Sequence, residues 1–151
     1  KRYPSTQADL QEQFDFLLAV RDKLTETHET IIMIRKYRDE LNSIVEKDSK
    51  QKRRIEPIIQ QISDIEKELY QTQNKSGQDP LNYPIRLNNK LAHLNVIAGT
   101  GSYRPTDGAE EVRVEITRQI NIQLTKFREI ESKQISKILN IEEMKTELNK
   151  K

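Results

Sequence analysis

The sequence predicts an all-α protein, an antiparallel four-helix bundle with long first and last helices and a short buried third helix. Apolar residues recur at spacings of three and four along most of the chain, which is the period of an α-helix. Of the 151 residues, 33% are charged and 34% hydrophobic, which suits long helices that each bury one stripe. Only four Gly and five Pro interrupt the chain. No sustained alternation of apolar and polar residues predicts a strand.

The first helix is expected from about Thr6 to Lys47. Its apolar residues follow helical spacing: Leu10, Leu17, Val20, Leu24, Ile31, Ile34, Leu41 and Val45. One helix of roughly 60 Å, or two segments with a bend, would cover this range. Three polar residues interrupt the stripe, namely Gln13, Thr27 and Arg38. Such gaps fit an antiparallel bundle better than a tight coiled coil.

A second helix is expected to start between Lys50 and Glu56 and to close near Lys75, with Gly77 as its C-terminal cap. Its stripe consists of Ile55, Ile58, Ile59, Ile62, Ile65 and Leu69. Pro57 either begins this helix or kinks it, because proline lacks the backbone donor and crowds the preceding turn. The basic segment 47–54, KDSKQKRR, is expected to be a solvated turn between the two helices.

A short third helix is expected from about Pro84 to Ala98. At 100° per residue its apolar side chains form two separate faces, which predicts partners on both sides. One face holds Leu87, Leu91, Leu94 and Ala98, and the other holds Ile85, Ala92 and Val96. Asn88 and Asn95 fall between these faces and are expected to be buried, where their amides need partners.

The remaining polar residues of this helix form an arc that is expected to face water and is a candidate interaction surface: Arg86, Asn89, Lys90 and His93. In the flanking loops, Asn82 is a candidate N-cap, Gly99 fits a left-handed helix end, and Gly101 frees the backbone to turn. Exposed loop aromatics and arginines are favoured at interfaces, so Tyr103 and Arg104 are candidate recognition residues.

The last helix is expected to begin near Asp107, whose side chain would cap the amide of Glu110 while Glu110 reaches back. Its stripe consists of Val112, Ile116, Ile120, Leu124, Phe127 and Ile130. Four further residues can extend it almost to the end of the chain: Ile135, Ile138, Met144 and Leu148. The boundary around Ser132 stays open.

Several function classes find no support in the sequence. The net charge of +2 does not argue for nucleic acid, and no run approaches the ~20 apolar residues of a membrane span. Without Cys there are no disulfides or thiolate metal sites. The two histidines, His28 and His93, lack metal-ligand spacing, and no nucleophile–base pattern is present. No catalytic residue, metal or cofactor is therefore predicted.

Three segments resemble a known family: FLLAVRDKLTETHETI (16–31), ELYQTQNKSGQDPLNYPIRLNNKLAHL (68–94) and GSYRPTDGAEEV (101–112). Together they are similar to the C-terminal helical region of bacterial, Bacteroidetes-type proteins whose main body is a sortilin-like β-propeller with sialidase repeats. Those proteins are often described as glycosyl hydrolases. The resemblance implies a parent that is secreted or associated with the cell envelope, and a non-catalytic helical module that follows the propeller.

Residues 1–151 are thus expected to form a single helical-bundle domain, excised from the C-terminal region of a larger protein. Its expected function is an accessory interaction module that packs on its own upstream propeller or on a protein partner, with a homo-oligomer also possible. Any hydrolase activity would lie in the propeller, which this chain lacks. The alternative is a bundle that binds a small ligand or glycan through Asn88 and Asn95 or through the 99–108 loop.

Overall fold

The computed structural model describes residues 5–76 and 79–140, and no strand occurs among them. The all-α prediction is confirmed, since this part of the chain forms four α-helices. They are α1 (Gln7–Lys47), α2 (Lys52–Leu69), α3 (Leu87–Gly99) and α4 (Asp107–Ile130), with 3₁₀ turns at Ser49–Gln51 and Asp79–Leu81 and a π-helical turn at Glu131–Ile135.

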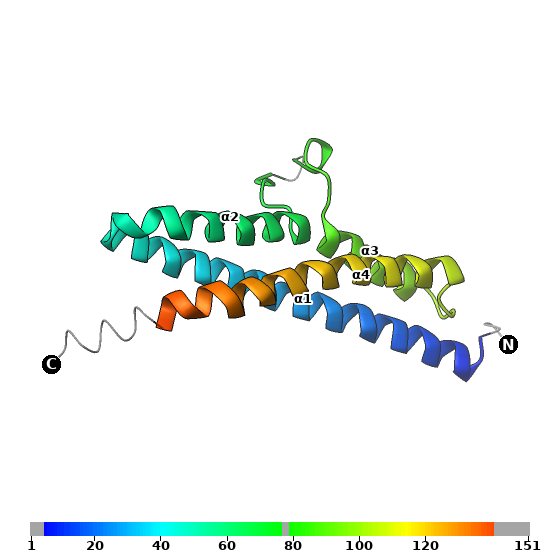
Figure 1. The fold of residues 1–151 in the computed structure, drawn as a ribbon. Helices are drawn as coiled ribbons and strands as arrows, with labels where there is room; N and C mark the ends of the chain where they lie inside the picture. The colour runs from blue at the N-terminus through cyan, green and yellow to red at the C-terminus, as the bar shows by residue number, and fades with distance from the viewer. Residues whose placement is uncertain (1–4, 77–78, 141–151) are drawn as a thin grey trace.

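Helix α1 runs the length of the bundle, and α2 and α3 follow one another along it (Figure 1). Lys23 of α1 donates to Asn121 of α4 at 2.7 Å, and Tyr37 donates to Glu131 just beyond α4 at 2.7 Å. From the first pair to the second, the residue number rises in both helices, so α1 and α4 run in the same direction. Helices α2 and α3 run opposite to them (Figure 1). Each level of the bundle therefore contains three helices: α1, α4 and either α2 or α3.

One continuous apolar core joins all four helices. It forms because each helix contributes a stripe at helical spacing, and these stripes meet along the bundle axis. Its fully buried hydrophobic side chains are Val20, Ile34, Leu41, Ile55, Ile62, Leu69, Leu91, Ile120, Leu124 and Ile135.

The polar gaps in the stripe of α1 are all hydrogen-bonded. Gln13 donates to the carbonyl oxygen of Ala98, and Thr27 donates to that of Lys23 at 2.7 Å. Arg38 donates to the carboxylate of Glu66 at 2.6 Å. These bonds satisfy polar groups that would otherwise interrupt the core at a cost.

Helix α2 starts within the expected window and continues through Pro57, but the expected end near Lys75 is wrong. The helix stops at Leu69, the last residue of its apolar stripe, and the backbone of Tyr70 is extended. Gln71 then leaves helical geometry, with its side-chain amide donating to the carbonyl of Pro84 at 2.7 Å. Residues 72–76 offer no apolar side chain that could hold another turn against the core. The expected cap, Gly77, lies outside the described residues.

Helix α3 departs from the expectation in two ways. It begins at Leu87 rather than Pro84, and neither Asn82 nor any other side chain caps it. Only the face with Leu87, Leu91 and Leu94 is buried; of the other expected face, Ile85 precedes the helix and Val96 is exposed. The reason is the number of neighbours, since a three-helix level offers α3 partners on one side only. Gly99 does not adopt the left-handed conformation; Gly101 does, with φ +86°.

Helix α4 is capped by Thr106, not by Asp107 as expected: the Thr106 hydroxyl accepts from the amide of Ala109 at 3.1 Å. After Ile130 the ladder widens into the π-helical turn, and the amide of Ser136 donates to the carbonyl of Glu131. Helical geometry continues to residue 140. The expected extension through Met144 and Leu148 lies outside the described residues.

Candidate interaction surface

We call one end of the bundle the loop end; it comprises the start of α1, the end of α3, the 100–106 loop and the start of α4 (Figure 1). Helix α1 begins there with a capping box. The Thr6 hydroxyl accepts from the Asp9 amide at 3.2 Å, and the Asp9 carboxylate accepts from the Thr6 amide at 2.7 Å. Hydrogen bonds from the side chain and backbone of Thr6 lower the pKa of Asp9, and the nearby charge of Arg104 adds to this effect. Arg104 therefore lies within electrostatic reach of the α1 cap.

Two further contacts fix the end of α3 and the 100–106 loop against α1. The side-chain amide of Gln13 donates to the carbonyl oxygens of Ala98 at 2.6 Å and Gly101 at 2.9 Å. Gly101 is required at its position, since a Cβ there would lie 2.8 Å from the ring of Tyr103 and its φ is positive. Tyr103 itself is 56% exposed.

Large exposed apolar side chains occur on every segment of the loop end. Six of them, 44% to 66% exposed, come from all four of its segments: Leu10, Phe14, Val96, Ile97, Tyr103 and Val112. Leu10 and Phe14 are four residues apart and share a face of α1. Exposed apolar side chains that gather in one region mark interaction sites.

An acidic hollow of about 340 Å³ also lies at the loop end, between α1 and the start of α4. Four carboxylates line it: Glu12, Asp15, Asp107 and Glu110. Arg113 lies over the ring of Phe16 with its guanidinium carbon 5.7 Å from the ring centroid. Its hydrogen bonds to Glu110 lower the pKa of Glu110 and raise the pKa of Arg113. The carboxylates outnumber the single arginine, so the hollow favours a cationic group.

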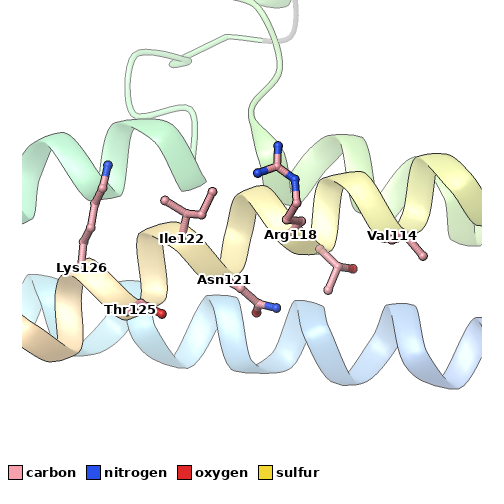
Figure 2. Close-up of a pocket in the computed structure, with 7 residues that line it drawn as sticks. Val114, Arg118, Asn121, Ile122, Thr125 and Lys126 are labelled. Carbon is pink, nitrogen blue, oxygen red and sulfur yellow. The ribbon is translucent and has the colours of Figure 1, made fainter.

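A second open hollow, of about 610 Å³, follows the outward side of α4. Figure 2 shows Arg118, Ile122 and Lys126 on one side of the helix, and Asn121 and Thr125 on the side toward α1. All of its lining residues belong to α4, so it is a helix face rather than a cavity between helices. It does not bring together chemistry from separate elements.

The structure separates the candidate residues of α3. Asn88 is buried as expected, 5% exposed, with its amide nitrogen 3.5 Å from the Nε2 atom of His28. Its carbonyl oxygen has no hydrogen-bond partner among the described residues. Asn95, in contrast, is exposed, so the expectation that both amides are buried is wrong. With one amide in the core and the other on the surface, the two do not line one enclosed pocket.

The polar arc of α3 faces water: Asn89, Lys90 and His93 are exposed, and Arg86 is half-buried, 3.8 Å from Glu68. Tyr103 and Arg104 are exposed at the loop end, where the sequence placed them in a recognition loop. The loop with Tyr103 and Arg104 follows the end of α3, whereas the arc begins at its start. The helix has 13 residues and extends about 20 Å.

Sequence reasoning missed most of the apolar residues at the loop end. Their helical spacing assigned Leu10 and Val112 to buried stripes. Both lie close to a helix end, outside the buried part of the stripe, and remain exposed. Phe14 carried a usable signal, since it falls outside the stripe of α1. A large aromatic on the polar side of an amphipathic helix is a candidate contact residue.

Fold and surface together define a class, an all-α helical bundle with one apolar, loop-bearing end. Comparison with family models, with curated proteins and with solved structures finds no match. Among the described residues, no helix combines the length and apolar character needed to cross a membrane. In that same part of the chain, no group of three or more His, Asp or Glu side chains is placed to hold a metal ion.

Proposed function

We propose that this chain is a non-catalytic interaction module, which docks through its loop end onto the β-propeller of a secreted or envelope-associated parent. The observation that carries the proposal is the set of six exposed apolar side chains at that end, in a chain of which one third is charged. Removing such side chains from water on binding contributes about 25 cal/mol per Å² of apolar surface. The propeller as partner rests on the resemblance of segments 16–31, 68–94 and 101–112.

The acidic hollow adds a requirement on the partner. Its four carboxylates also lie at the loop end and would pair with a lysine or arginine of the docked surface. A partner surface that covers this end would therefore combine apolar and basic residues. Tyr103 and Arg104 stand at the tip of the loop, where a central aromatic anchor is favoured.

Binding of the purified chain to the upstream region encoded by the same gene, measured by calorimetry, tests this function. The triple variant Phe14→Ser/Val96→Ser/Tyr103→Ser is expected to weaken binding at least tenfold. The matched control, Ile32→Ser/Leu81→Ser/Ile122→Ser, also removes three exposed apolar side chains, but away from the loop end. Both variants must retain the helical circular dichroism of the wild type. Equal binding by the two variants would contradict the proposal.

A further inference from the structure

A concave site with excess positive charge lies at the other half of the bundle, where the end of α2 meets α1. Its volume is about 330 Å³, at the lower end of the range for small-ligand pockets. Two arginines of α1, Arg35 and Arg38, and Lys67 of α2 line it together with the buried Glu66. Tyr70 closes one side, with the guanidinium carbon of Arg35 5.2 Å from its ring centroid.

Glu66 holds both arginines in place. The residue is 2% exposed, and its two oxygens accept from Nε of Arg35 and from Nη1 of Arg38, each at 2.6 Å. A guanidinium has five N–H donors, so these contacts engage one donor of each arginine. Within the described residues no other hydrogen bond engages either guanidinium. Four donors on each arginine are thus left for water or for a ligand.

The charges around the hollow do not cancel. Arg35, Arg38 and Lys67 bring three positive charges, whereas Glu66 brings one negative charge, and Asp64 brings another by pairing with Lys67 at 2.9 Å. The C-terminal end of α2 adds roughly half a negative charge. A positive excess remains, and one arginine would have sufficed to neutralise Glu66. The side chains of Arg35 and Arg38 keep 46% and 30% of their surface accessible, so the surplus charge faces solvent.

We propose that Arg35, Arg38 and Lys67 form a binding site for an oxyanion, the carboxylate or phosphate group of a small ligand. Each guanidinium is held through one nitrogen and keeps an edge with two parallel N–H donors, the geometry that binds such groups in a bidentate manner. Because Glu66 and Tyr70 already order the arginines, little side-chain entropy is lost when an anion binds. Asn74 at the rim offers a neutral amide donor. This site does not rest on the docking function, since it lies away from the loop end.

Titration of the ¹⁵N-labelled chain with inorganic phosphate, and separately with acetate, at constant ionic strength tests the site. The side-chain Nε–H signals of Arg35 and Arg38 are expected to shift saturably with at least one anion. Saturation with phosphate alone assigns a phosphate-bearing ligand, and saturation with acetate assigns a carboxylate-bearing one. Absence of saturable shifts with both anions overturns the proposal.

The Lys67→Gln variant separates a defined site from general charge attraction, because Lys67 is exposed and its loss leaves the Glu66 contacts intact. We expect it to weaken anion binding about fivefold, the size of one partly exposed charge interaction. Lys36→Gln is the matched control: Lys36 is adjacent to Arg35 on α1 and 71% exposed, but it does not line the hollow. If both substitutions weaken anion binding equally, the effect comes from the net charge alone and the proposed site is overturned.

Discussion

The buried carboxylate of Glu66 gives the sharpest prediction. Replacing both Arg35 and Arg38 by Met removes its two cationic partners but keeps most of the apolar stems that cover α1. Glu66 is 2% exposed, so water does not replace the lost donors. Removing the partners of a buried charge costs about 3–5 kcal/mol. We therefore expect the double variant to lose about 3–4 kcal/mol of unfolding free energy at pH 7.

Urea unfolding followed by circular dichroism at pH 7 measures this difference. Adding Glu66→Met to the double variant removes the buried charge and should restore most of the lost stability. Lys36→Met/Lys47→Met is the control, since it deletes two exposed cations from the same helix and should change stability by no more than about 1 kcal/mol. If the double variant loses less than about 1 kcal/mol at pH 7 and Glu66→Met has no effect in its background, the reasoning is refuted.

Three further predictions concern the bundle, each measured by urea unfolding. Leu91→Ala, at a fully buried position of α3, should cost about 2–5 kcal/mol, whereas Val96→Ala on the exposed face should change stability by less than about 0.5 kcal/mol; similar losses would show that both faces are buried. Pro57→Ala should stabilise by about 1–3 kcal/mol, because it supplies the missing amide donor inside α2, and a loss would contradict this. The pKa of Glu26 is lowered by its hydrogen bond to Lys23 and by Arg128 of α4, so its contribution is present above about pH 4.5 and lost as the pH falls through the lowered pKa. Glu26→Gln should then cost about 0.2–1 kcal/mol at pH 7 and less at pH 3, and an equal cost at both would exclude this linkage.

The helices could be predicted because their apolar period is encoded residue by residue. The stripe that runs from Val20 to Leu41 requires no knowledge of the partner helices, and α1 forms where it predicts a helix. The ends were harder to place because neighbouring residues compete as caps. Thr106 and Asp107 both have the side chain of an N-cap, and the threonine takes the position.

The burial of α3 could not be predicted, for a different reason. Periodicity shows that Ile85 and Val96 share an apolar face, but it does not show how many helices surround α3. The end-to-end arrangement of α2 and α3 leaves three helices at each level, so this face stays in solvent (Figure 1). The hollow of Arg35, Arg38 and Glu66 was missed similarly, because it joins residues 28 to 31 positions apart in the sequence.

The two proposed sites are far enough apart to be tested independently. Gln13 marks the loop end on α1 and Arg38 marks the anion site, and the 25 residues between them extend about 38 Å along one helix. Substitutions at such separations are additive to within about 0.5 kcal/mol unless a shared element has two arrangements. Phe14→Ser should therefore leave phosphate binding unchanged, and Lys67→Gln should leave docking unchanged. A phosphate-dependent change in docking affinity would instead mean that α1, the one element common to both sites, shifts between two packings against α2 and α3.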